Sequence, residues 1–193
     1  MNCATAQIVR TGWDMIMKKR SKTFTLTLAA VLCAVGIIIP IFSPLKIMLP
    51  PASFTLASHV PIFIAMFLSP VVGGAVALGT ALGFLAGGFL FEIVLRALTH
   101  CIFAVVGGLV LQKKPELMKT RLPLLVFAIL ISLLHAVCEV AVVTPLYFAK
   151  ETTGNYVHAV ILLVGAGTVI HSMIDFALAL IVWRAVNKKV KTA

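Results

Sequence analysis

The sequence predicts an all-α integral membrane protein, built as one compact bundle of six transmembrane helices. The 193 residues are 61% hydrophobic and only 11% charged, and their mean hydropathy is +1.12. A soluble domain of this length has no reason to be so apolar, whereas a protein that crosses the membrane several times does. The apolar residues fall in runs whose lengths lie near the roughly 20 residues that a membrane-spanning helix needs. The basic residues gather beside these runs, mostly on one side of the predicted membrane.

The predicted spans are separated by short links that are either polar or rich in proline. In chain order the spans cover residues 24–42, 55–68, 71–89, 90–111, 122–148 and 156–186. The second span is short and Pro61 interrupts its hydrogen bonds, so it would enter at an angle or be partly re-entrant. Three prolines within residues 43–54 forbid a regular helix there. Residues 1–23 form a basic lead-in without a clear signal-peptide cleavage site, and residues 187–193 form a basic tail, so the chain 1–193 is predicted to be a single membrane domain.

The distribution of Lys and Arg predicts the orientation of the bundle. Thirteen of the 16 basic residues lie before the first span, between the fourth and fifth spans, or after the sixth span. Lys46 and Lys150 lie on the opposite side, and Arg96 lies within the membrane. Because cytoplasmic loops carry the excess of Lys and Arg, both termini are expected in the cytoplasm and the number of spans is even. The formal charge of +10 therefore reflects orientation in the cell membrane and does not indicate nucleic-acid binding.

Arg96 lies inside the fourth span, where a charge is costly. An ionised group at the bilayer centre costs roughly 2.5–3.5 kcal/mol on insertion scales, and arginine cannot lose its proton to avoid that cost. Such a residue needs an anion close by. Glu139 in the fifth span is the expected partner when no ligand is bound, and a substrate carboxylate would replace it or share the guanidinium through bidentate pairing. Arg96 is therefore the predicted ligand contact.

Three successive spans each carry two polar residues four positions apart, which places both on one face of the helix. The pairs are Arg96 with His100, His135 with Glu139, and His171 with Asp175. At 1.5 Å of rise per residue, the residues expected to line one cavity open to the exterior are His59, Arg96, His100, His135 and Glu139. His171 lies near the midplane too, and the deeper Asp175 is expected to serve structure or a subunit contact. For each histidine the alternative is an interhelical bridge worth about 0.6–2 kcal/mol.

The residues outside these pairs argue against several kinds of chemistry. Four histidines and two carboxylates could ligate a transition metal, but the four histidines lie in four different spans and no HExxH motif occurs, so no metal is expected. The sequence contains no GxSxG motif and no P-loop, so neither catalysis nor ATP binding is expected of this chain, which makes an intramembrane metal-dependent enzyme a remote alternative. A stand-alone carrier that relays protons through His135 and Glu139 stays open.

Small residues mark two helix faces where backbones can approach closely. Ala30 and Ala34 form an AxxxA pattern in the first span, which is weak on its own in an alanine-rich helix. In the third span a stripe of small residues is expected to pack within the bundle, and it consists of Ala75, Gly79, Gly83 and Gly87. No internal repeat is evident, which argues against an inverted-repeat transporter.

Taken together, these features resemble the substrate-binding S component of an energy-coupling factor (ECF) vitamin transporter. The features shared are the six spans, the basic lead-in, AxxxA in the first span, the proline-rich loop after it, and the polar residues of spans four to six. The segments PPASFTLASHVPIFIAMFLSP, LGTALGFLAGG and VLRALTH are most similar to the niacin-type S components. The resemblance implies tight capture of a vitamin at the outer face. It also implies association with a membrane T subunit and two ABC ATPases, which would use the ATP, and toppling in the membrane to release the vitamin inward.

The resemblance also implies roles for individual residues. Ala30 and Ala34 would contact the T subunit, and a lid would be formed by residues 43–54, including Lys46, Ser53 and Phe54. The residues that would bind the vitamin are His59, Arg96, His100, His135, Glu139 and His171, with Tyr147 and Asn155 from the fifth loop region. Nicotinate offers one carboxylate to the arginine and a ring that Phe54 and Tyr147 could stack on. Pantothenate and a pyridoxine-type ligand would use the same donors, so the sequence leaves the vitamin open.

Overall fold

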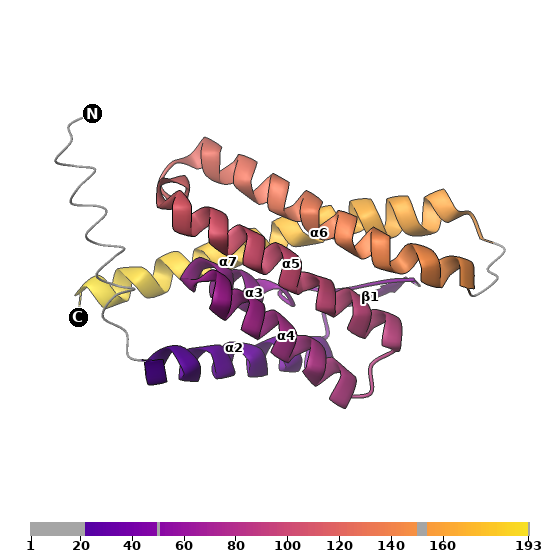
Figure 1. Cartoon of the computed structure of the whole chain (residues 1–193), viewed down its shortest axis with the longest axis horizontal. Coiled ribbons are helices and arrows are strands. Elements are labelled where there is room, and N and C mark those ends of the chain that lie inside the picture. Colours follow the sequence, from indigo (N-terminus) through magenta and orange to yellow (C-terminus); the bar gives the residue numbers. More distant parts are fainter. Residues whose placement is uncertain (1–21, 50, 150–153, 193) are drawn as a thin grey trace.

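The computed structural model describes residues 22–49, 51–149 and 154–192, which form a helical bundle with a small hairpin at one end (Figure 1). Most of the basic lead-in, as well as Lys150, lies outside these residues. In chain order the elements are α2 (Lys22–Phe42), β1 (Lys46–Leu49), β2 (Ala52–Thr55), α3 (Val60–Leu68), α4 (Pro70–Ala86), α5 (Phe91–Lys113), the 3₁₀ turn η1 (Pro115–Met118), α6 (Arg121–Ala149), the π-helix η2 (Val157–Ala166) and α7 (Gly167–Thr192).

Four helical segments of the described chain are long and apolar enough to cross a membrane, namely α2, α5, α6 and the continuous run of η2 and α7 over Val157–Val186. The first three lie within two residues of the predicted spans at each end. The helical membrane architecture is thereby confirmed. Helices α3 and α4 have 9 and 17 residues and do not meet the same length requirement, so the count of six spans stays a prediction.

The prediction of an all-α fold missed a two-stranded antiparallel hairpin. Strands β1 and β2 pair Lys46 with Thr55 and Leu49 with Ala52, inside the segment expected to be an irregular loop. The prolines do exclude a helix in this segment, but they are compatible with strands that begin or end beside them. A proline lacks the amide hydrogen that a strand ladder needs, and each proline of this segment lies outside the two strands.

The second predicted span also begins later than expected. Residues 52–55 belong to β2, a turn follows, and α3 starts only at Val60, with Pro61 in its first turn. The predicted break between the second and third spans is confirmed: Ser69 accepts a hydrogen bond from the Val72 amide at 3.1 Å, and Pro70 opens α4. A proline fits the first turn of a helix because its missing donor would have no partner there.

Helix α3 lies at the centre of the main hydrophobic core. Its side chains are buried among α4, α5 and α7, and the aromatic ring of Phe63 lies 5.2 Å, between centroids, from both Phe103 and Phe176. Helix α5 approaches the α3–α4 junction closely, because a Cβ atom added at Gly108 would lie 2.6 Å from the Cα atom of Pro70. This core packs directly beside the polar residues described below, since His59 precedes α3 and His100 lies on α5.

The glycine stripe of α4 packs within the bundle, as predicted. A Cβ atom at Gly79 would lie 2.7 Å from the Cys33 sulfur, and one at Gly83 would lie 2.2 Å from Ile37 Cδ1, so both glycines allow α2 to lie against α4. Ala30 and Ala34 are on another face of α2 and are exposed on the outside of the bundle.

The two ends of the bundle differ in character (Figure 1). At one end lie the start of α2, the link between α5 and α6, and the end of α7; at the other lie the hairpin and the link between α4 and α5. Lys113, Lys114, Lys119 and Arg121 of the α5–α6 region are at the first end. The candidate functional site lies at the second end, beside the hairpin.

Candidate functional site

A cavity of about 480 Å³ lies at the hairpin end of the bundle, among α2, the hairpin, α4, α5, α6 and α7. Its walls are largely apolar and include Ile62, Phe84, Phe89 and Ile93. Polar side chains line other parts of it, and they are Lys46, Ser53, Thr55, Ser58, His59, Thr80, Arg96, His100, Glu139, Thr168 and His171. A cavity of this size, mostly apolar with a few convergent polar groups, is typical of a small-molecule site.

Arg96 and Glu139 form the buried ion pair of this cavity. Arg96 Nη2 donates to Glu139 Oε2 at 2.9 Å, and the two residues are only 5% and 3% exposed. The hydroxyl of Thr168 donates to the same carboxylate oxygen at 2.5 Å. The structure thus contains the pairing expected when no ligand is bound. A buried carboxylate of this kind offsets the cost of burying the guanidinium.

The guanidinium of Arg96 has donors to spare. Its Nη1 donates to the Pro51 carbonyl at 3.4 Å, and its Nε is buried without a hydrogen-bond partner among the described residues. The hydroxyl of Thr80, which lines the cavity too, is also buried without such a partner there. Because an arginine carries five N–H groups, Arg96 can bind a second anion while it keeps its bond to Glu139.

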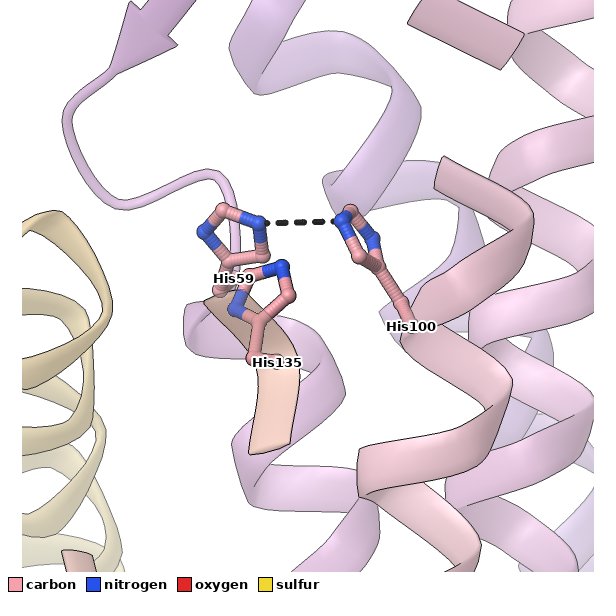
Figure 2. A group of neighbouring side chains, drawn as sticks. All are labelled: His59, His100 and His135. Carbon is pink, nitrogen blue, oxygen red and sulfur yellow. Dashed lines mark hydrogen bonds between the residues drawn. The ribbon is translucent and has the colours of Figure 1, made fainter. Parts of the chain in front are cut away.

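Four histidines from different segments meet at the base of the cavity, and three of them, His59, His100 and His171, line it. The ring of His59 lies 4.6 Å from that of His100, 4.8 Å from that of His135 and 4.9 Å from that of His171, measured between centroids. Figure 2 shows the first three rings facing one another, with a hydrogen bond of 3.3 Å between the Nε2 atoms of His59 and His100. His135 is fully buried behind the cavity wall and does not line the cavity itself.

Two carboxylates flank the histidines. Glu139 Oε1 lies 3.6 Å from His100 Nε2 and 3.5 Å from His135 Nε2, and Asp175 Oδ2 lies 3.1 Å from His59 Nδ1 and 3.4 Å from His171 Nε2. The pairs His135–Glu139 and His171–Asp175 therefore share a helix face, as their spacing of four predicted.

Asp175 holds the turn before α3 and does not line the cavity. Its carboxylate accepts hydrogen bonds from the amides of Ala57 at 2.8 Å and His59 at 2.9 Å, as well as meeting the His59 ring. Ala57 has a φ of +68°, in the left-handed region that L residues seldom adopt. The structural role expected of Asp175 is therefore observed: it fixes a strained turn and aims His59.

The hairpin covers the cavity from the side of α7. All three proposed lid residues, Lys46, Ser53 and Phe54, line the cavity. The ring of Phe54 lies 5.4 Å from that of His171 and directly over Gly167, where a Cβ atom would lie 2.7 Å from Phe54 Cζ. The absence of a side chain at Gly167 is what allows Phe54 to sit there.

Tyr147 and Asn155 do not line the cavity, contrary to the position expected for them. The Tyr147 hydroxyl donates to the Gly154 carbonyl, and its ring packs in a separate apolar cluster with Val143 and Val160. The Asn155 side chain is exposed and accepts from the His158 amide at 3.2 Å. Neither side chain reaches the polar residues of the cavity.

The sequence analysis missed Thr168, Thr80 and the aromatic walls of the cavity. Thr168 lies one helical turn before His171, on the face that also carries Asp175, so the spacing of 168, 171 and 175 was a signal that could have been found. Phe89 follows Gly88, whose φ of +73° lets the α4–α5 link turn back toward the cavity. The pair Gly87–Gly88 predicts a turn, but it does not indicate that the next residue, Phe89, lines the cavity.

Fold and site together define a multi-pass membrane protein with a small-molecule cavity among its helices. No protein-family model matches the chain, and no solved structure matches it. The chain is 42% identical over 170 residues to the niacin transporter NiaX of Lactococcus lactis subsp. cremoris (strain MG1363), a match that covers 86% of this chain and 76% of that protein. This chain therefore belongs to the family of that transporter, the niacin-type S components of ECF vitamin transporters. The resemblance drawn from the sequence is confirmed.

Proposed function

We propose that this protein captures nicotinate from outside the cell as the substrate-binding subunit of an ECF importer, with Arg96 binding the carboxylate. The name of the similar transporter supports niacin as the vitamin. The observation that carries the residue assignment is the buried guanidinium at the cavity, which has an Nε donor without a partner among the described residues. A carboxylate that approaches from the cavity can accept from Nε and from Nη2, the two donors on one side of the guanidinium, and would then share Nη2 with Glu139.

The size and lining of the cavity also suit nicotinate. The ligand is a planar ring with one carboxylate, and ligand pockets typically measure about 300–1,000 Å³, a range that includes the 480 Å³ found here. Phe54, Phe84 and Phe89 offer aromatic faces or edges to the ring. Thr80 and His100 are within the lining as hydrogen-bonding partners for the ring nitrogen. Phe54 thus takes the stacking role, which the sequence analysis had shared with Tyr147.

The proposed orientation places the cavity at the outer surface and both termini in the cytoplasm, with α3 and α4 as the short second and third of six spans. The basic α5–α6 region lies at the end of the bundle opposite the hairpin, in agreement with the excess of positive charge in cytoplasmic loops. Lys46 on the hairpin lies at the cavity, where it would attract an anion. The hairpin would act as the lid.

The proposed partners are a membrane T subunit and two ABC ATPases, which would consume the ATP; no cofactor is assigned to this chain. The exposed face of α2 with Ala30 and Ala34 is the proposed contact with the T subunit. Small residues on an exposed helix face let another membrane helix approach closely, which supports this assignment.

Calorimetric titration of the detergent-purified protein with nicotinate, nicotinamide, pantothenate and pyridoxine tests the proposal. We expect tight binding of nicotinate and much weaker binding of nicotinamide, which lacks the charge. Tight binding of another vitamin would keep the transporter class and correct the substrate. Absence of binding by all four would contradict the proposal.

One observation favours a second function, a stand-alone proton-coupled carrier: the buried contacts from Glu139 to His100 and His135 could relay protons. Proteoliposomes that contain only this protein separate the two functions. Nicotinate uptake driven by a pH gradient, without ATPases, would establish the carrier, whereas binding without uptake agrees with the S component.

A further inference from the structure

We propose that the floor of the cavity is a transition-metal site, in which His59, His100 and His135 supply three imidazole ligands and Glu139 supplies a carboxylate oxygen. One ligand atom from each histidine lies within 4.8 Å of the others, and all three residues are buried. Figure 2 shows the three rings directed toward a common centre. The sequence alone did not indicate a metal site, because the three histidines come from three separate segments.

The distances between the proposed ligand atoms suit one small ion. A tetrahedral Zn²⁺ with bonds of about 2.0–2.1 Å to nitrogen and oxygen holds its ligand atoms about 3.3–3.4 Å apart. The Nε2 atoms of His59 and His100 are 3.3 Å apart. Glu139 Oε1 lies 3.6 Å from His100 Nε2 and 3.5 Å from His135 Nε2. Three of the six distances between the four ligand atoms are therefore near the required length, and the ligand atoms of the three histidines lie within 4.8 Å of one another. Glu139 is not part of that group of three and is added as the fourth ligand because of its distances to His100 and His135.

The groups behind the ligands hold them in the orientation that metal binding requires. His59 Nδ1 is bonded to Asp175 at 3.1 Å, and His135 Nδ1 is bonded to Ser172 at 3.3 Å, which leaves both Nε2 atoms for the centre. Glu139 binds Arg96 and Thr168 through Oε2, which leaves Oε1 for the centre. Metal-ligating histidines usually hydrogen-bond a carboxylate or another acceptor through the second ring nitrogen. His100 Nδ1 has no hydrogen-bond partner among the described residues.

An ion at this position would also satisfy a polar atom that otherwise lacks a partner. His135 is fully buried, and its Nε2 makes no hydrogen bond within the described part of the chain. Glu139 Oε1 lies 3.5 Å away without forming a hydrogen bond to this nitrogen, whereas buried polar atoms nearly always have a hydrogen-bond partner. A metal ion coordinated by His135 Nε2 removes the discrepancy.

The net charge of the buried groups also favours a bound cation. With neutral imidazoles, which metal ligation requires, Arg96, Glu139 and Asp175 leave the floor with a net charge of −1. A divalent ion changes this to +1, which one bound carboxylate would neutralise. Only this last consequence rests on the proposed function; the metal site itself does not. Imidazole and carboxylate ligands suit Zn²⁺, and Co²⁺ serves as its spectroscopic substitute.

The test measures metal binding without nicotinate, so that its outcome is independent of the vitamin. The full chain is purified in detergent without a polyhistidine tag, stripped with EDTA and equilibrated with ZnCl₂; bound zinc is then measured by mass spectrometry. We expect about one Zn²⁺ per chain, and the visible absorption of four-coordinate Co²⁺ when cobalt replaces zinc. Zinc below about a tenth of an equivalent would overturn the proposal.

Variants locate the site. His135→Ala is expected to lose the ion, and Ser172→Ala, which removes only a hydrogen bond to a ligand, is expected to weaken zinc affinity about 10–100-fold. His158→Ala is the matched control, because His158 is exposed and makes no part of the cavity. His171→Ala tests the other group of possible ligands, which consists of His59, His171 and Asp175. Retention of zinc by His135→Ala, or its loss from His171→Ala alone, would contradict the proposed ligand set; a thermal unfolding curve for each variant confirms that it is folded.

Discussion

Arg96 on α5 and Glu139 on α6 form an ion pair of 2.9 Å in which both side chains are almost completely buried. The pair connects two membrane helices and at the same time presents the guanidinium to the cavity. Structure and ligand recognition therefore depend on the same contact, and the first two predictions follow from this double role.

Arg96→Gln should weaken nicotinate binding by about 30- to 5,000-fold, because the loss of one partner of a buried charge pair typically costs about 2–5 kcal/mol. Calorimetric titration measures the change. The matched control is Arg184→Gln, which removes an exposed arginine near the end of α7 and should leave affinity unchanged. An Arg96→Gln protein that binds nicotinate normally would show that the carboxylate binds elsewhere.

The same substitution should also lower stability, since it leaves Glu139 buried without its cation. The expected loss is about 3–5 kcal/mol in the free energy of unfolding. The double variant Arg96→Gln/Glu139→Gln removes the orphaned charge and should recover part of the stability without recovering nicotinate binding. Thermal unfolding in detergent, with zinc removed by EDTA, compares the three proteins. If the single and double variants were equally stable, the charge of Glu139 would not be what destabilises the Arg96→Gln protein.

Gly167→Val should displace the lid, because a side chain at this position would occupy the place of the Phe54 ring. We expect nicotinate to dissociate faster, with a smaller effect on its association, since the lid would no longer hold the ligand in the cavity. Ala166→Val adds similar bulk to an exposed neighbour and serves as the control. Rapid-dilution measurements of radiolabelled nicotinate give the rates; an unchanged dissociation rate would show that the hairpin does not retain the ligand.

Asp175→Ala should destabilise the protein, because it leaves the amides of Ala57 and His59 without their acceptor. Each orphaned buried donor costs about 1–3 kcal/mol. Ala57→Gly is the complementary change: its φ of +68° costs an L residue about 1–2 kcal/mol, so glycine should be tolerated or slightly stabilising. Thermal unfolding with EDTA present checks both, and an Asp175→Ala protein as stable as the unaltered one would remove Asp175 from this role.

Ala34→Trp should abolish ATP-driven uptake in proteoliposomes that contain the complete importer, while nicotinate binding to the isolated chain stays normal. A large ring on the exposed face of α2 would prevent the proposed close approach of the T subunit. Leu82→Trp, on the exposed face of α4, is the control. Loss of binding by Ala34→Trp would instead place this face within the substrate domain.

Local patterns in the sequence predicted the helices and the polar floor well, because both depend on short-range regularities. Long apolar runs identified α2, α5 and α6, and the spacing of four residues placed His135 with Glu139 and His171 with Asp175. The pairing of Arg96 with Glu139 followed from the cost of an isolated charge in a membrane.

The features that the sequence analysis missed depend on how distant segments come together. The hairpin requires β1 and β2 to pair, and the prolines that exclude a helix do not by themselves indicate strands. Tyr147 packs in a separate apolar cluster and the Asn155 side chain is exposed, so neither lines the cavity. The proposed metal site depends on the same kind of long-range arrangement, since His59, His100 and His135 come from separate segments that meet only in the folded bundle.

The most direct test of the central claim compares nicotinate with nicotinamide on the unaltered protein and on Arg96→Gln. If Arg96 binds the carboxylate, the unaltered protein prefers nicotinate strongly, and the variant loses most of that preference because it binds nicotinate far more weakly. A variant that still prefers nicotinate by the same factor would contradict the account, since the charge of the ligand would then be recognised by another group.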